Sequence, residues 1–417
     1  MLILMNDLKT LLRILIYSIS NALFFLFGLL IGRNDNIVLF GAWMGTRFAD
    51  NSRFLFQFLA KNKDELSLKR VIWVSRKRDV VDELTRMGYE AYLIGTWPSM
   101  YWHLKAGIHI MCNMSAKSGN HLPDIDVKLS SGAKKVQLWH GVGIKAVGAT
   151  SNAIRNSSGR RSRWVSRFAN KEIIRKIGSL GGWAEPKILC TSELNVDINV
   201  GNSNIHRRNA FISGYPRYCD CLAYTDEEKS ILNTMRSYSN VILYLPTFRD
   251  EGASYYHPLE SKDLQSFILR NNILWIEKPH QAERNNQPKN ILENAIYLKS
   301  DFDVNILLQS VDAIVSDYSS AAFDAIYLRK PVIMYVPDLD EFEKGGNGLL
   351  FNLREYCPSL LSFDVSALID SLLTIINQTY LTKERSKTLD KMRLDFFGNK
   401  EHSYFSIWQD IKKVVVG

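Results

Sequence analysis

Short apolar runs alternate with helix-like stretches over most of this chain, and they do so in two separate series. In the first series, we interpret five runs as strands, at residues 37–40, 70–75, 91–94, 108–112 and 135–138. Stretches with helical periodicity separate several of them, at residues 52–60, 80–87 and 97–105. Such alternation is typical of a parallel sheet with helices on its faces. The first half of the chain is therefore predicted to form a doubly wound α/β domain.

A second series follows a polar break at residues 220–239. Its strand candidates are residues 241–245, 273–276, 295–298, 313–315 and 332–335. A chain of 417 residues, 46% of them hydrophobic, is long enough for two core-bearing domains. The predicted fold class is α/β, with two Rossmann-like domains facing a cleft. The predicted divisions are an N-terminal apolar helix (1–33), a first domain (34–220), a second domain (221–362) and C-terminal helices (363–417), one of which could cross back onto the first domain.

The N-terminal region contains 19 residues without a charge, from Ile14 to Gly32. As a helix they would be roughly 28 Å long, just enough to span the apolar part of a bilayer. No small-residue cleavage site follows, so a signal peptide is not expected. Ser18 and Ser20 interrupt the apolar surface and favour a helix that lies in the membrane interface. A true span and an ordinary core helix remain the alternatives.

The net charge of +9 favours an anionic partner. A basic segment at residues 155–176 contains a single acidic residue, and its arginines include Arg160, Arg161, Arg163 and Arg167. One interpretation is a solvated face; the other is a surface for anionic lipid headgroups or an anionic acceptor chain. No recognition motif supports nucleic acid as a partner. The five cysteines form no C-x-x-C pair and no zinc pattern, which suits a reducing compartment.

The sequence Ser316-Asp317-Tyr318-Ser319-Ser320 lies between a buried strand and a predicted helix at residues 321–328. A turn from a strand into a helix start exposes backbone N–H groups at the positive end of the helix dipole. With serine hydroxyls beside them, these groups can hold a phosphate. The alternative is that Asp317 and the serines only cap the helix.

Three further clusters follow predicted strands, where doubly wound domains expose their functional residues. His140 stands between Trp139 and Gly141 after the strand at 135–138, and can act as a general base near neutral pH. Thr247 and Arg249 follow another strand and offer donors for phosphate oxygens. The third cluster contains Lys278 and His280. Taken one at a time, each cluster also fits an ordinary turn or surface loop.

In their order along the chain, these motifs resemble those of the CDP-glycerol glycerophosphotransferase family, the teichoic-acid and capsule polymerases and primases. The resemblance covers about residues 36 to 355. It is carried by W-H-G-x-x-x-K at 139–145, G-Y-P-R at 214–217, P-T-F-R-D at 246–250, K-P-H at 278–280, S-D-Y-S-S…F-D at 316–324 and R-K-P-V-I-M-Y-V-P-D-L-D at 329–340.

The resemblance implies a GT-B fold whose second domain holds a CDP-linked polyol. His140 then matches the family's catalytic histidine, which deprotonates the acceptor hydroxyl, and His280 matches a second histidine near the donor pyrophosphate. The donor-binding residues would be Thr247, Arg249, Lys278, Asp317, Ser319 and Ser320. Lys145 and the basic segment would face the acceptor or the membrane. One departure, Lys344-Gly345-Gly346-Asn347-Gly348 leading to Asn352, puts the pocket for the donor's polyol in doubt.

Phosphoryl transfer depends mainly on positioning and charge neutralisation. No compact carboxylate cluster is visible, so neither a metal nor another cofactor is predicted. The predicted enzyme transfers a polyol phosphate from a CDP-linked donor to a lipid-linked or polymeric acceptor, at the cytoplasmic face of a bacterial membrane. A glycosyltransferase that uses a sugar nucleotide is one alternative. A non-catalytic module that binds anionic polymer is the other.

Overall fold

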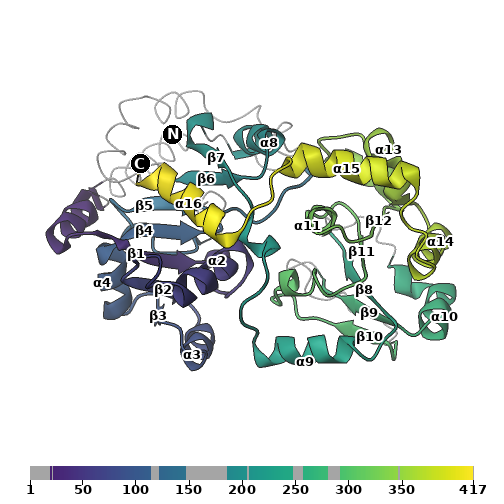
Figure 1. The fold of residues 1–417 in the computed structure, drawn as a ribbon, viewed down its shortest axis with the longest axis horizontal. Coiled ribbons are helices and arrows are strands. Elements are labelled where there is room, and N and C mark those ends of the chain that lie inside the picture. Colours follow the sequence, from purple (N-terminus) through teal and green to yellow (C-terminus); the bar gives the residue numbers. More distant parts are fainter. Residues whose placement is uncertain are drawn as a thin grey trace, which may run out of the picture.

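The computed structural model describes residues 19–20, 22–113, 122–146, 186–203, 206–247, 257–279, 292–345 and 348–416. Within them the chain forms two α/β units side by side, each built on one parallel sheet (Figure 1). Arg249, His280 and the basic segment with Arg160, Arg161, Arg163 and Arg167 lie outside the described residues.

The first sheet has seven strands in the order β3-β2-β1-β4-β5-β6-β7, and all neighbours are parallel. Its strands are β1 (Asn34–Gly41), β2 (Arg70–Ser75), β3 (Ala91–Leu93), β4 (Ala106–Met111), β5 (Lys134–Gln137), β6 (Lys187–Cys190) and β7 (Ala210–Ile212). Its helices are α2 (Asp50–Lys61), α3 (Arg78–Arg86), α4 (Trp97–Lys105) and α8 (Glu193–Ser203). All six residues of β4 are buried, as expected for a central strand covered on both faces.

The second sheet has six parallel strands in the order β10-β9-β8-β11-β12-β13. Its strands are β8 (Asn240–Leu245), β9 (Ile273–Glu277), β10 (Ala295–Tyr297), β11 (Ala313–Ser316), β12 (Val332–Tyr335) and β13 (Leu361–Ser362). Its helices include α10 (Lys262–Arg270), α11 (Ala321–Tyr327), α12 (Leu339–Lys344) and α13 (Leu353–Tyr356). In both sheets the strand order reverses beside the first strand of the series, which is where doubly wound proteins bind ligands.

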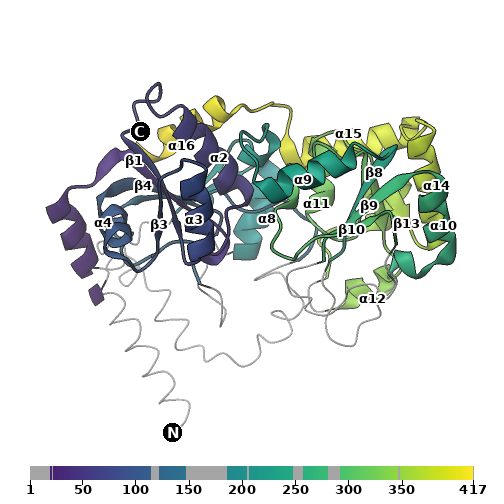
Figure 2. The same cartoon turned by 90° about the horizontal axis from the view of Figure 1, so that it is seen from below.

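Two connections join the units. The region interpreted from sequence only as a polar break contains a helix, α9 (Asp226–Met235), which starts with a capping box between Thr225 and Glu228. At the C-terminus, α14 (Val365–Ile376) and α15 (Lys383–Phe397) cover the second unit, and α16 (Tyr404–Val415) returns to the first (Figures 1 and 2). There Ser213 donates to Asp410 across 2.7 Å.

The predicted α/β class with two doubly wound domains is confirmed. The predicted bounds of β2, α4 and β12 agree with the structure residue for residue. The prediction missed β6, β7 and β13, which have only four, three and two residues. Length alone does not explain this, because β12 also has four residues. Two of the missed strands, β7 and β13, lie at sheet edges and are only partly buried, so no buried apolar run marks them.

Residues 22–31 are helical, and much of their apolar surface is exposed. Leu26 is 54% exposed and Leu30 is 82% exposed. Arg33 ties the end of this helix to the first domain by donating to the carbonyls of His103, Ala106, Leu129 and Ser131. Across the residues that the structure describes, no helix is both long and apolar enough to cross a membrane. Residues 1–18 of the predicted N-terminal segment lie outside the described part.

Candidate active site

The strand-end loops after β8 and β11 are joined by one carboxylate. Asp317 accepts a hydrogen bond from the backbone N–H of Thr247, which lies 2.9 Å from each carboxylate oxygen. It also accepts from the N–H of Tyr318 at 2.6 Å. Because β8 and β11 are neighbours where the strand order reverses, these loops form the crevice in which the second domain is expected to bind a ligand. The structure therefore brings Thr247 and Asp317 together there.

Ser319 and Ser320 stand in the same turn, immediately before α11, and both are half-buried. The hydroxyl of Ser319 accepts from the N–H of Ala321 at 3.3 Å. Ser320 occupies the N-cap position, but its side chain caps no backbone N–H of the helix. Ser320 instead faces the first domain, where its neighbour is Gly141.

The loop that carries His140 follows β5 and meets Ser320 directly. Gly141 has φ +149°, and a Cβ atom at this position would lie 2.8 Å from Ser320 Oγ. A side chain at this position would therefore force Ser320 to move, and this backbone conformation also favours glycine. The loop with the predicted general base therefore contacts the loop with the predicted phosphate donors, across the two domains.

His140 sits against two indole rings, with ring centroids 5.7 Å from Trp43 and 4.7 Å from Trp139. Burial lowers the pKa of His140, the charges of Arg217 and Lys145 lower it further, and Asp50 opposes them. A histidine with a lowered pKa is neutral near pH 7 and has a free ring nitrogen lone pair for a proton. The site thus provides the protonation state that a general base needs.

The loop beyond His140 is joined to the second domain by backbone contacts. Lys145 and Leu349 form an isolated antiparallel bridge. On either side of it, the N–H of Ala146 donates to Gly348 at 3.1 Å and the N–H of Leu350 donates to Ile144 at 2.7 Å. Lys145 therefore lies at the domain junction, next to the segment that departs from the family pattern.

Lys278 follows β9, and its N–H donates to the carbonyl of Tyr244 at 3.2 Å. Burial lowers the pKa of Lys278 to about 8, the charge of Arg47 contributes, and Asp303 and Asp301 oppose the shift. Arg47 lies between β1 and α2, with its guanidinium 5.4 Å from the centroid of the Trp43 ring. Lys278 of the second domain and Arg47 of the first are therefore two cationic side chains close to each other, one from each domain.

Sequence reasoning missed Arg47 and gave no role to Asp50 or Arg217. Arg47 follows the carboxyl end of β1, so the strand-end rule that selected His140 would also have selected it. Arg217 lies in η4 (Pro216–Tyr218) and was noted only as part of G-Y-P-R. It binds Asp50 at 2.7 Å and Asp324 at 2.6 Å, contacts that no sequence pattern displays.

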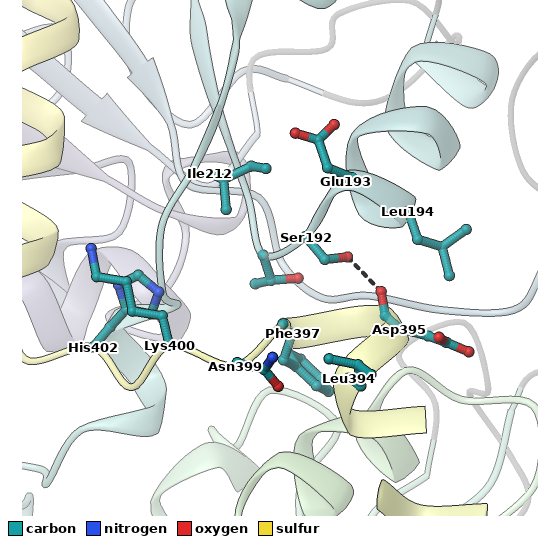
Figure 3. Close-up of a pocket in the computed structure, with 12 residues that line it drawn as sticks. Ser192, Glu193, Leu194, Ile212, Leu394, Asp395, Phe397, Asn399, Lys400 and His402 are labelled. Carbon is teal, nitrogen blue, oxygen red and sulfur yellow. Dashed lines mark hydrogen bonds between the residues drawn. The ribbon is translucent and has the colours of Figure 1, made fainter. Parts of the chain in front are cut away.

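Figure 3 shows a pocket of about 390 Å³ at the carboxyl end of β6, and it contains none of the predicted site residues. Here Thr191 donates to the carbonyl of Phe396 at 2.6 Å and Ser192 to that of Asp395 at 2.7 Å. These bonds fasten the end of α15 to the first domain. We assign this pocket to that junction and not to the site around His140.

No group of three or more His, Cys, Asp or Glu side chains could hold a metal ion among the residues that the structure describes. That the enzyme needs no metal ion stays a prediction, and activity in the presence of a chelator can test it. Two of the cationic groups at the described site, Arg47 and Lys278, are suited to phosphate.

A profile of the family described as CDP-Glycerol:Poly(glycerophosphate) glycerophosphotransferase matches residues 23–396. A teichoic acid poly(glycerol phosphate) polymerase of Bacillus spizizenii is 24% identical over 376 residues, which cover 86% of this chain and 88% of the relative. A teichoic acid glycerol-phosphate transferase of Staphylococcus aureus is 24% identical over 356 residues, which cover 82% of this chain and 84% of the relative.

The solved structure of the wall teichoic acid polymerase TagF is similar to this chain with a TM-score of 0.68 and 19% identity. The similarity covers 99% of this chain and 98% of that one. It confirms the predicted GT-B-like architecture. Because the family profile matches most of the chain, the protein belongs to the CDP-glycerol:poly(glycerophosphate) glycerophosphotransferase family.

Proposed function

We propose that this enzyme transfers glycerol phosphate, or a related polyol phosphate, from a CDP-linked donor to a hydroxyl of a lipid-linked or polymeric acceptor. The observation that carries the proposal is the contact between Gly141 and Ser320. It puts the loop that carries a candidate base, in one domain, beside the loop that carries candidate phosphate ligands, in the other. The family to which the chain belongs supports the donor class.

In the proposed reaction, His140 accepts the proton of the acceptor hydroxyl. The acceptor oxygen forms a bond to the β-phosphorus of the donor, and the bond from that phosphorus to the bridging oxygen breaks. CMP leaves with the bridging oxygen and its electron pair. Little covalent chemistry is asked of the protein, because positioning and charge neutralisation dominate phosphoryl transfer.

The donor pyrophosphate would be held from the second domain. Ser319, Ser320 and Thr247 offer hydroxyls, Lys278 offers charge, and Asp317 fixes the turn through two backbone N–H groups. We assign Arg249 and His280 to the same pyrophosphate from their sequence positions. No metal or other cofactor enters this proposal.

We further propose that the enzyme works as a peripheral or monotopic protein on the cytoplasmic face of a bacterial membrane. The exposed apolar side chains of residues 22–31 support this, since a continuous apolar helix face is suited to the membrane interface. A basic chain would be attracted to anionic lipid. Lys145, Arg160, Arg161, Arg163 and Arg167 are assigned to the acceptor or this lipid surface.

The test is CMP release by the full-length protein from CDP-glycerol, CDP-ribitol and a panel of UDP- and CMP-sugars, with membrane extract as acceptor. Acceptor-dependent CMP from a CDP-polyol, unchanged by EDTA, is expected. Turnover with sugar nucleotides only would move the function to glycosyl transfer. Binding of anionic polymer without turnover of any donor would favour the non-catalytic alternative.

A further inference from the structure

Arg217 is a buried arginine whose carboxylate partners come from both domains. Its Nη1 lies 2.7 Å from Asp50 at the start of α2, and its Nη2 lies 2.6 Å from Asp324 on α11. The three side chains are only 2–4% exposed. Removing one partner from a buried ion pair leaves an uncompensated charge, so this arrangement is costly to disturb.

The same guanidinium also holds the loop that carries the candidate base. Arg217 Nη1 donates to the carbonyl of His140 at 2.9 Å. Neighbouring carbonyls of this loop are held as well: Asn51 donates to Trp139 at 3.0 Å, and the hydroxyl of Tyr215 donates to Gly141 at 3.4 Å. The backbone before, at and after His140 is therefore held by hydrogen bonds from Arg217 and its neighbours Asn51 and Tyr215.

The opposite arm of Arg217 reaches the helix that starts at the candidate phosphate site. Asp324 lies four residues after Ser320, about one helical turn, on α11. The hydroxyl of Tyr218 also donates to Asp324, at 2.6 Å. Arg217 thus connects the His140 loop to the Ser320 helix through one planar group.

We propose that Arg217 is a positioning residue that sets the distance between His140 and the phosphate held at the start of α11. This inference rests on the proposed function. Arginine is required because its rigid fork directs separate N–H groups to three acceptors at once, whereas a lysine ammonium is a flexible point charge. A base displaced by about 1 Å can cost on the order of 10² in rate.

Arg217 also balances the charge around His140. The charged groups that influence His140 are Asp50, Arg217 and Lys145. In Arg217→Gln, the positive charge near His140 is removed and Asp50 loses its cationic partner, so the pKa of His140 should rise. The acidic limb of the rate profile then moves to higher pH, because the neutral histidine is the active form. A residue that only stabilises the fold would not move that limb.

The experiment compares Arg217→Lys with Arg53→Lys in the full-length protein. Arg53 is a matched control, since it is 1% exposed and pairs across the domains with Glu228 at 2.5 Å. Within the described part of the chain, its hydrogen bonds go to Glu228, Cys221 and Ala223 and not to the His140 loop. For Arg217→Lys, kcat should fall about 10²-fold, while the Kd for CDP-glycerol changes less than about twofold. Arg53→Lys should lower the melting temperature with a much smaller loss of kcat.

Asp324→Asn is the second variant, because it weakens one arm of Arg217 and retains the side-chain shape. It should also lower kcat without weakening donor binding. Equal kcat losses for Arg217→Lys and Arg53→Lys would overturn the inference. It would also be overturned if the acidic limb of the pH–rate profile of Arg217→Gln coincided with that of the unmodified enzyme. If the unmodified protein releases no CMP from any CDP-polyol, the proposed function is wrong and this inference falls with it.

Discussion

The backbone N–H of Thr247 is 2.9 Å from both carboxylate oxygens of Asp317, so one side chain ties together the loops that end two neighbouring strands. Asp317→Ala would leave the N–H groups of Thr247 and Tyr318 without this acceptor. Hydrogen bonds to a charged group contribute about 1.5–3 kcal/mol. We expect CDP-glycerol to bind at least about tenfold more weakly, measured by calorimetry. Asp226→Asn, on an exposed helix start, should leave binding unchanged; equal losses would contradict the assignment.

His140→Ala should lower kcat by about 10²- to 10⁴-fold, the contribution typical of a general base. Donor affinity should remain, because the role proposed for His140 is to deprotonate the acceptor. In the unmodified enzyme, activity should persist below pH 6.5 and disappear only as the pH falls through the lowered pKa of His140. His206→Ala is the control, since His206 is exposed. Loss of donor binding in His140→Ala would overturn its role as the acceptor base.

The KM for CDP-glycerol should rise above about pH 8. The pKa of Lys278 is lowered to about 8, so its positive charge is lost as the pH rises through that value. Phosphate oxygens would then lose one cationic partner. Lys278→Gln should raise KM at pH 7 and flatten the increase between pH 7 and 9, whereas exposed Lys299→Gln should do neither. If the KM of Lys278→Gln rises between pH 7 and 9 as much as that of the unmodified enzyme, the group that titrates is not Lys278.

Gly141→Ala should remove most activity, because the added Cβ would lie 2.8 Å from Ser320 Oγ and 3.0 Å from its Cβ. Gly88→Ala is the matched control. Gly88 also has positive φ, +83°, but a Cβ there has no neighbour within 4 Å. Both variants should lose on the order of 1–3 kcal/mol of stability from backbone strain, and only Gly141→Ala should lose transfer activity. Comparable activity in the two variants would show that the domain contact is not needed for turnover.

Replacing Leu26 and Leu30 together by aspartate should reduce binding to vesicles that contain anionic lipid. These side chains are 54% and 82% exposed on the helix at residues 22–31. Transfer to a soluble acceptor analogue should be retained. Leu381→Asp changes an equally accessible leucine, 69% exposed, between α14 and α15, and it should leave vesicle binding unaltered. Undiminished binding of the double variant would exclude this helix as the membrane contact.

The alternation of apolar runs and helical stretches predicted much of the fold, and the strand-end rule predicted part of the site. His140, Thr247 and Asp317 each follow a strand whose apolar run is visible in the sequence. Thr247 and Asp317 follow neighbouring strands of one sheet, so their proximity follows from parallel pairing. His140 follows β5 of the other sheet, so its approach to Ser320 depends on how the two domains meet. The rule also applies to Arg47, which the prediction missed. Arg217 could not be assigned a role in this way, because its function depends on Asp50 and Asp324, which are 167 and 107 residues away.

The missed strands have a physical explanation as well. The edge strand β7 is only partly buried, and its last residue, Ile212, is 41% exposed. Pairing with β6 defines it, through partners such as Leu189 opposite Phe211. The partly exposed β7 therefore shows no buried apolar run in the sequence.

The antiparallel bridge between Lys145 and Leu349 joins a short segment of the second domain to the first domain. Two backbone hydrogen bonds, from Ala146 to Gly348 and from Leu350 to Ile144, would resist any movement of the two sheets away from each other during a catalytic cycle. If they hold, residues 348–350 travel with the first domain, although β12 and β13 on both sides of them belong to the second. The moving parts of this enzyme would then not coincide with its domains.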